Sequence, residues 1–265
     1  SLSIKKGETY GLVGESGCGK STTGRAIVGL TKPDSGSILY DGKDLCKLSD
    51  KEFKPLRKEL QMVFQNTLSA LNPRQRIGNI LEDILKIHSN LDAAERREKV
   101  VEVLKKVGLS EDHYFRFPHE LSGGQVQRLG IASALVIGPK LIVCDEPVSA
   151  LDVSIQAQIL NMLMQLQKEL GLSLLFISHD IGVIRFISDR IGVMYLGTLV
   201  EETDTEELFA NPLHPYTKGL FASVPDPYIE RDGFSELSGE QPVRTEDFKG
   251  CAFSTRCPHA TEKCR

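Results

Sequence analysis

Strand-like apolar runs alternate along this chain with segments in which apolar residues recur every three or four positions. The runs at residues 8–13, 141–145 and 174–178 each have the length of one buried strand. Between the last two runs, apolar residues recur with the spacing of one helix face, at Ile159, Met162, Leu163, Leu166 and Leu170. Apolar strands that alternate with amphipathic helices predict an α/β fold with a mostly parallel sheet covered on both faces.

A helical section interrupts this pattern between about residues 65 and 138. Within it, residues 94–107 place Val100, Val103, Leu104 and Val107 on one helix face. Further upstream, residues 37–42 predict a strand and turn of an antiparallel β flap.

The pattern of apolar and polar residues changes near residue 212. Beyond it, prolines recur in a polar segment with little periodicity. The sequence therefore predicts one domain over residues 1–212, with an inserted α-helical subdomain at about 66–138. A small irregular C-terminal extension follows over residues 213–265.

Composition narrows the class of protein further. With 265 residues, 40% hydrophobic and 26% charged, the chain can bury a sizeable core. No apolar run approaches the roughly 18 residues that span a bilayer, and the first residues lack the apolar core of a signal peptide, so we expect any membrane role to be peripheral. The formal net charge of −4 weighs against nucleic acid as the main partner.

The first chemical signal is the sequence Gly-Glu-Ser-Gly-Cys-Gly-Lys-Ser at residues 14–21, which matches G-x-x-x-x-G-K-[ST] between a predicted strand and a predicted helix over 21–30. Backbone N–H groups of such a loop bind phosphate oxygens, while Lys20 reaches the β- and γ-phosphates and Ser21 ligates Mg²⁺. The predicted nucleotide-binding residues are Gly14, Glu15, Ser16, Gly17, Cys18, Gly19, Lys20, Ser21 and Thr22. Cys18 is either a small filler or a reactive thiol with a pKa lowered by the helix N-terminus.

Polar residues also follow three predicted strands. The run at 141–145 ends with Asp145 and is followed by Glu146, His179 follows the run at 174–178, and Gln65 follows residues 62–64. Ligands of open α/β folds gather at this carboxyl edge, where an aspartate or glutamine can hold Mg²⁺ and a glutamate can polarise an attacking water. A histidine there can donate to the γ-phosphate. Taken singly, each is also an ordinary strand-end, capping or loop residue.

A second glycine-rich segment, Leu-Ser-Gly-Gly-Gln at residues 121–125, opens a predicted helix. A helix N-terminus binds anions, and the loop at 14–21 does not need this one for its own nucleotide. Two phosphate-binding ends on one chain predict that copies pair face to face.

In this order the motifs resemble those of the ATP-binding cassette ATPases. The resemblance lies in residues 14–21 (Walker A), Gln65 (Q-loop), 121–125 (signature), 141–146 (Walker B), 149–152 (D-loop) and His179 (switch histidine). It implies a P-loop NTPase fold that hydrolyses ATP with Mg²⁺. The implied catalytic residues are Glu146 as general base, His179, Gln65 and Lys20, and the implied metal ligands are Ser21, Gln65 and Asp145.

The same resemblance implies a dimer in which each subunit completes the site of the other. The residues implied to act on the partner's nucleotide are Ser122, Gly123, Gly124, Gln125 and Asp152. Because only thirteen residues precede Gly14 and the family's adenine-stacking aromatic lies further upstream, we expect the chain to begin inside its domain.

Other segments resemble one branch of the family, the subunits that energise import of dipeptides, oligopeptides or nickel. These segments are residues 61–65, 69–74, 144–158, 214–217 and 256–258. The resemblance implies a homologous or identical ATPase subunit as dimer partner, transmembrane permease subunits, indirect contact with an external binding protein, no nucleic acid, and a peripheral place on the cytoplasmic face of the membrane. A cassette ATPase that acts on DNA or ribosomes is the alternative, although residues 66–120 contain no sustained heptads.

Six cysteines fall into two groups. Cys18, Cys46 and Cys144 are scattered, which fits a reducing cytosol, whereas three others crowd the end of the chain. Cys251, Cys257 and Cys264 are open to three interpretations: a 4Fe-4S cluster of the kind some members of the resembled branch carry, a zinc site completed by His259, or free thiols or a disulfide.

Overall fold

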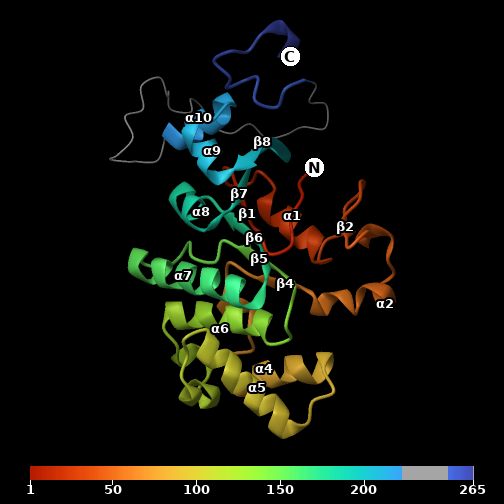
Figure 1. The fold of residues 1–265 in the computed structure, drawn as a ribbon, viewed down its shortest axis with the longest axis vertical. Coiled ribbons are helices and arrows are strands. Elements are labelled where there is room, and N and C mark those ends of the chain that lie inside the picture. The colour runs from red at the N-terminus through yellow and green to blue at the C-terminus, as the bar shows by residue number, and fades with distance from the viewer. Residues whose placement is uncertain (223–249, 265) are drawn as a thin grey trace. The chain divides into compact units, whose positions relative to one another are not determined.

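The structure is a computed structural model that describes residues 1–222 and 250–264. Figure 1 shows the chain as a ribbon coloured by residue number. The chain divides into two compact units. One consists of Ser1–Ile4, Glu8–Ser21 and Phe176–Arg265, and the other of Lys5–Gly7 and Thr22–Leu175. We call them the terminal unit and the central unit. Residues 223–249 and 265, part of the predicted extension, lie outside the described residues.

The described residues form one six-stranded sheet and one two-stranded sheet. The strand order of the first is β4-β5-β6-β1-β7-β8, and β2 pairs with β3 in the second. The strands are β1 (Thr9–Val13), β2 (Leu39–Tyr40), β3 (Lys43–Asp44), β4 (Leu60–Val63), β5 (Leu141–Asp145), β6 (Ser173–Ser178), β7 (Arg190–Tyr195) and β8 (Thr198–Asp204). Every residue of β1, β5 and β6 is buried, as the apolar runs predict. The mostly parallel sheet with one antiparallel pair confirms the predicted fold class.

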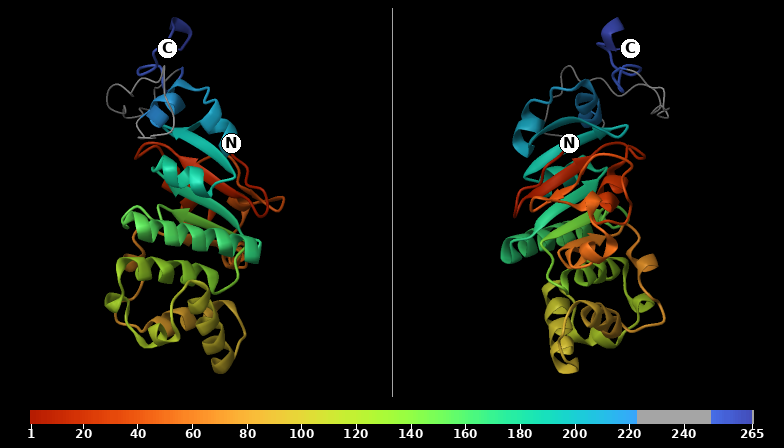
Figure 2. Two further views of the ribbon diagram at one scale, coloured as in Figure 1. Left: turned by 60° about the vertical axis from the view of Figure 1, so that its left-hand side comes forward. Right: turned by 90° about the vertical axis from the view of Figure 1, so that its right-hand side faces the viewer.

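In the terminal unit, β1 pairs in parallel with β7 from Tyr10↔Arg190 to Val13↔Val193, and β7 pairs antiparallel with β8. Helix α8 (Ile181–Ile187) packs on β1 so closely that a Cβ on Gly11 would lie 2.3 Å from Ser188 Oγ. Helices α9 (Thr205–Ala210) and α10 (Pro215–Ala222) follow β8 in blue in Figure 2.

Helix α10 corrects the expectation of irregular structure after residue 212. Pro215 occupies its first position, where a proline's missing N–H costs no hydrogen bond, and Tyr216, Leu220 and Phe221 are buried beyond it. The proline therefore begins a helix here.

Three aromatic rings pack together in the core of the terminal unit. Tyr195 lies 4.6 Å from Tyr216 and 5.2 Å from Phe253 between ring centroids, and Tyr216 lies 5.6 Å from Phe253. All three side chains are among the largest fully buried ones. They belong to β7, α10 and the segment 250–264, so the described end of the chain shares a core with the sheet.

In the central unit, β4 pairs in parallel with β5 from Leu60↔Leu141 to Val63↔Cys144. Between these strands the chain forms α3 (Thr67–Ala70), α4 (Ile77–His88), α5 (Ala93–Lys106) and α6 (Gly123–Leu135) (Figure 1). Helix α5 begins with a capping box of Asp92 and Glu95 and buries Val100, Val103, Leu104 and, just beyond its end, Val107, as the periodicity predicts.

Helix α7 (Val153–Leu170) follows β5 and ends at Gly171, whose φ of 64° is the left-handed conformation that a glycine adopts without strain. Helix α1 (Lys20–Ile27) follows the glycine-rich loop and ends before the predicted limit at residue 30. The antiparallel flap is present, since β2 and β3 pair across a turn in which Asp41 and Gly42 have φ of 47° and 78°. Helix α2 (Asp50–Phe53) follows the flap. No described helix is both long enough and apolar enough to cross a bilayer.

Candidate nucleotide-binding and hydrolytic site

The loop between β1 and α1 has a backbone that only glycine permits at its first position. A Cβ on Gly14 would lie 2.1 Å from the carbonyl oxygen of Met194 and 2.9 Å from Cys18 Sγ. Gly17 and Gly19 have φ of 81° and 104°, a region that other residues rarely adopt. The loop is therefore held close to β7, with a backbone conformation that depends on its glycines.

Lys20 lies over this loop, with only 5% of its surface exposed. Its Nζ donates to the carbonyl oxygens of Gly14 at 2.6 Å and Glu15 at 3.0 Å. These acceptors are neutral, so they orient the ammonium without cancelling its charge. The loop thus combines a concentrated positive charge with a helix N-terminus, which is the donor set that a polyphosphate requires.

Of the two alternatives for Cys18, the structure supports a small buried side chain that fills space beneath the loop and not a reactive thiol. Its side chain is 1% exposed, and its Sγ lies 3.8 Å from Lys20 Nζ. Burial raises the pKa of the Cys18 thiol despite the lysine beside it. A buried thiol with a raised pKa is a poor nucleophile, so the reactive-thiol interpretation is wrong.

His179 follows β6 directly and is exposed in the terminal unit, the same unit as the loop at 14–21. Its neighbours fix the backbone on either side. Ser178 Oγ accepts from the N–H of Asp180 at 3.0 Å, and Asp180 Oδ1 caps α8 by accepting from the N–H of Val183 at 3.1 Å. The imidazole is therefore presented at the end of a buried strand.

In the central unit, Gln65 and Glu146 meet at the ends of the paired strands β4 and β5. Gln65 Nε2 donates to Glu146 Oε2 at 3.0 Å, and the neighbouring Asp145 is 3% exposed. Glu146 has a φ of 47°, a strained value for a residue with a side chain, and such strain is characteristic of functional sites. The predicted strand-end cluster of two carboxylates and an amide is thus present.

Residues 149–152 are tied to this cluster by the start of α7. Ser149 Oγ donates to the carbonyl oxygen of Glu146 at 3.1 Å. Gln156 Nε2 donates to the carbonyl oxygens of Val148 at 3.1 Å and Leu151 at 2.9 Å. Gln156 is a positioning residue that the sequence patterns missed, because a glutamine inside a helix carries no local signal of a loop contact.

Ser122 and Gln125 form the capping box of α6. Gln125 Oε1 accepts from the N–H of Ser122 at 3.0 Å, and Ser122 Oγ accepts from the N–H of Gln125 at 3.4 Å. A Cβ on Gly124 would lie 2.6 Å from Ile155 Cγ2, so α6 and α7 begin in close contact. The segments 121–125 and 149–152 are thereby brought together.

The residues predicted to bind and hydrolyse the nucleotide therefore fall into separate groups. The terminal unit contains residues 14–21 and His179, and the central unit contains Thr22, the Gln65–Asp145–Glu146 cluster and the α6–α7 junction. Hydroxyl, amide and carboxylate oxygens are the hard donors that Mg²⁺ prefers. Ser21 supplies a hydroxyl in the terminal unit, and Gln65 and Asp145 supply an amide and a carboxylate in the central unit.

The segment with Cys251, Cys257 and Cys264 forms no metal centre among the described residues. Among residues 1–222 and 250–264, no three or more His, Cys, Asp or Glu side chains are gathered so that they could hold a metal ion. All six cysteines are free thiols. Backbone pairing does bring two of them near, because the N–H of Cys251 donates to the carbonyl oxygen of Cys264 at 2.9 Å. The iron–sulfur, zinc and disulfide interpretations find no support in this geometry.

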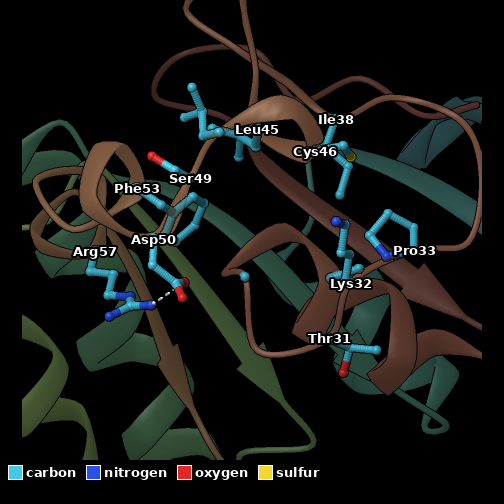
Figure 3. Close-up of a pocket in the computed structure, with 13 residues that line it drawn as sticks. Thr31, Lys32, Pro33, Ile38, Leu45, Cys46, Ser49, Asp50, Phe53 and Arg57 are labelled. Atoms are coloured by element: carbon cyan, nitrogen blue, oxygen red, sulfur yellow. Dashed lines mark hydrogen bonds and ion pairs between the residues drawn. The ribbon is translucent and has the colours of Figure 1, made fainter.

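A cavity of about 330 Å³ lies elsewhere in the central unit, between the end of α1, the flap and α2. Figure 3 shows Lys32, Phe53 and Arg57 on its walls, with Arg57 bonded to Asp50 at 3.4 Å. None of the predicted site residues lines this cavity.

Comparison with known protein families identifies two family models that match this chain. The family model described as "ABC transporter" matches residues 1–149, and the one described as "Oligopeptide/dipeptide transporter, C-terminal region" matches residues 200–264. Together with the fold and the loop at 14–21, this shows that the chain belongs to the ATP-binding cassette transporter family, as the resemblance of its motifs implies. It is an ABC-type ATPase.

Similar curated proteins are peptide transport subunits. The chain is 52% identical over 270 residues to the oligopeptide transport ATP-binding protein AppF of Bacillus subtilis, covering 100% of this chain and 82% of that protein. It is 51% identical over 267 residues to the oligopeptide transport ATP-binding protein OppF of Escherichia coli, covering 99% and 80%.

Two solved structures share the fold. The dimeric bacterial ABC transporter cassette MJ0796 has a TM-score of 0.70 and 34% identity, over 77% of this chain and 88% of that one. CbiO1 from Clostridium perfringens, part of the transporter complex cbiONQ, has a TM-score of 0.72 and 33% identity, over 79% and 82%.

Proposed function

We propose that this chain is the ATP-hydrolysing subunit of an importer that moves oligopeptides or dipeptides through a membrane permease. The observation that carries the peptide assignment is the match to peptide transport ATPases along the whole chain, including the C-terminal region at 200–264. The relatives named above favour peptides over nickel, and over an action on DNA or ribosomes.

In this proposal, residues 14–21 bind the phosphates of ATP. Backbone N–H groups and the α1 N-terminus contact the phosphate oxygens, and Lys20 turns its ammonium from the carbonyls of Gly14 and Glu15 toward the β- and γ-phosphates. Mg²⁺, when bound, supplies positive charge to the same oxygens, with Ser21, Gln65 and Asp145 as its proposed ligands.

Glu146 then acts as the general base. Its carboxylate accepts the proton of a water whose oxygen forms a bond to the γ-phosphorus, while the bond from that phosphorus to the β–γ bridging oxygen breaks and leaves ADP and phosphate. Gln65 holds the carboxylate through the 3.0 Å hydrogen bond, and His179 donates to the γ-phosphate as negative charge redistributes.

Each site is completed by a second subunit, identical or homologous. A solved relative is described as a dimeric cassette, and another structure of it as a post-hydrolysis state bound to ADP and Pi. Ser122, Gly123 and Gly124 open α6 and would place its N-terminus on the γ-phosphate across the interface, with Asp152 beside them. The amide of Gln125 is occupied by the capping box, so we assign it the role of holding this end of the helix.

We further propose that the subunit works at the cytoplasmic face of the membrane against permease subunits, and meets the external binding protein only through them. The transport names of the relatives and the C-terminal region match support this assembly.

The test is reconstitution of the chain with its permease in vesicles that enclose ATP. We expect ATP hydrolysis that rises when a peptide and the binding protein are added outside, and no rise with nickel. Glu146→Gln should retain ATP binding and accumulate as a closed dimer while losing at least about a hundredfold in kcat, which is the usual contribution of a general base. Near-normal hydrolysis by this variant would contradict the role of Glu146, and stimulation by nickel alone would contradict the substrate.

A further inference from the structure

Glu15, the second residue of the phosphate loop, is held by groups from distant parts of the terminal unit. Its carboxylate accepts two hydrogen bonds from the guanidinium of Arg256, at 2.8 Å from Nη1 and 3.2 Å from Nη2. Its backbone N–H donates to the hydroxyl oxygen of Tyr216 at 2.9 Å. Its carbonyl oxygen accepts from Lys20 Nζ at 3.0 Å. The residue that orients the lysine is therefore itself fixed by α10 and by the segment 250–264.

The pair of Glu15 and Arg256 is well sheltered from solvent. The Arg256 side chain is 6% exposed and that of Glu15 is 28% exposed. The guanidinium also lies 5.9 Å from the centre of the Tyr195 ring. A planar guanidinium that makes two parallel bonds to a carboxylate fixes both its position and its orientation, which a single contact does not.

The segment that carries Arg256 is anchored independently of this ion pair. Phe253 is 1% exposed and packs against Tyr195 and Tyr216 in the aromatic core. The N–H of Arg256 donates to the carbonyl oxygen of Phe253 at 3.0 Å, which sets the turn that presents the guanidinium. The packing of Phe253 therefore holds Arg256 next to Glu15 of the loop at 14–21.

This arrangement affects an anion that binds the loop in two ways. An unpaired carboxylate next to a triphosphate would repel it, and Arg256 compensates that charge at short range. In addition, the fixed Glu15 holds the loop backbone and Lys20 in one arrangement before the ligand arrives, which lowers the ordering cost of binding.

We propose that Arg256 is a positioning residue for nucleotide binding and that it acts through Glu15. The inference rests on the proposed role of residues 14–21 as the ATP-binding loop. In this inference Arg256 acts on the loop through Glu15 and makes no direct contact with the nucleotide. The C-terminal segment is thereby a working part of the ATP site, in addition to being a mark of the peptide-transport branch.

The first experiment measures the affinity of the full chain for a fluorescent ATP analogue. We expect Arg256→Met to weaken binding about tenfold, because it leaves a partly buried carboxylate uncompensated beside the phosphates. Arg256→Lys keeps the charge but loses the paired geometry and should show a smaller loss. Lys263→Met removes an exposed positive charge from the same segment and should change affinity less than twofold. Circular dichroism at the assay temperature verifies that each variant is folded.

The second experiment asks whether the effect passes through Glu15. In the Glu15→Gln background, Arg256→Met should cost less than about threefold, because no carboxylate remains to be compensated. An equal loss in both backgrounds, or unchanged affinity of Arg256→Met, overturns the inference and leaves the proposed function intact. Failure of the unmodified chain to bind the analogue contradicts the proposed function instead.

Discussion

Gln65 Nε2 donates to Glu146 Oε2 over 3.0 Å, although 81 positions separate the two residues in the sequence. The contact follows from the parallel pairing of β4 and β5, whose carboxyl ends present Gln65 and Glu146 at one edge. A hydrogen-bond donor on the proposed base restricts the positions that its carboxylate can take. We therefore expect turnover to depend on the amide of Gln65 as well as on the carboxylate of Glu146.

We expect Gln65→Ala to lower kcat for ATP hydrolysis about tenfold, since it frees the carboxylate of Glu146 and removes a proposed metal ligand. Steady-state ATPase assays at saturating ATP measure this. Gln165→Ala is a matched control, because Gln165 is exposed on α7 and bonds Glu169 at 2.7 Å. Equal rates for the Gln65→Ala variant and the unmodified protein would show that the hydrogen bond is incidental.

Gly14→Ala should abolish nucleotide binding, because the new Cβ would lie 2.1 Å from the Met194 carbonyl oxygen and the loop backbone must move. We also expect a loss of about 1–3 kcal/mol in the free energy of unfolding, the usual cost of overpacking. Gly36→Ala is the control, since Gly36 also has a positive φ but its Cβ would meet no atom within 4 Å. Calorimetric titration with ATP and urea unfolding give the two readouts. Retained ATP affinity would argue against the loop geometry.

Phe253→Ala tests whether the segment 250–264 shares the core of the terminal unit. Phe253 is 1% exposed against Tyr195 and Tyr216, so its truncation should lower the free energy of unfolding by about 3–5 kcal/mol. Phe186→Ala, at a ring that is 50% exposed, should cost far less. Denaturant titration compares the two, and similar losses would place Phe253 outside the core.

His214 predicts a pH dependence of stability. Burial lowers the pKa of its imidazole below the usual value of 6.5, and its Nδ1 accepts from the N–H of Tyr216 at 3.1 Å, which requires the neutral ring. The unfolded chain therefore binds the proton more readily, and stability falls as the pH drops from 6.5 through the folded-state pKa. His214→Gln should flatten this fall in unfolding experiments between pH 7 and 5, and the exposed His259→Gln should not. An unchanged slope in His214→Gln would contradict the assignment.

Local sequence patterns are sufficient to predict the parts of the candidate site that lie next to strands. The loop at 14–21 and the strand-end residues Gln65, Asp145 and Glu146 carry their signals within a few positions, and the carboxyl ends of parallel strands meet by geometry alone. The buried face of α5 is equally local, because it follows from helical periodicity.

Contacts between remote segments could not be predicted in this way. Tyr216 and Arg256 reach Glu15 across 201 and 241 positions, and no periodicity or motif links such side chains. The cysteines at 251, 257 and 264 likewise could not be interpreted from their spacing, and in the described residues they do not gather as a metal site. The prolines after residue 212 do not by themselves predict irregular structure, since a proline also opens a helix, as Pro215 does in α10.

The terminal unit is assembled from both ends of the chain, since β1 pairs with β7 and Phe253 closes the aromatic core. During synthesis, β1 emerges from the ribosome before β7 and the segment 250–264 have been made. The central unit, over residues 22–175, is complete much earlier and can fold while translation continues. The terminal unit, with the loop at 14–21, can therefore reach its final packing only after β7, α10 and the segment 250–264 have been made.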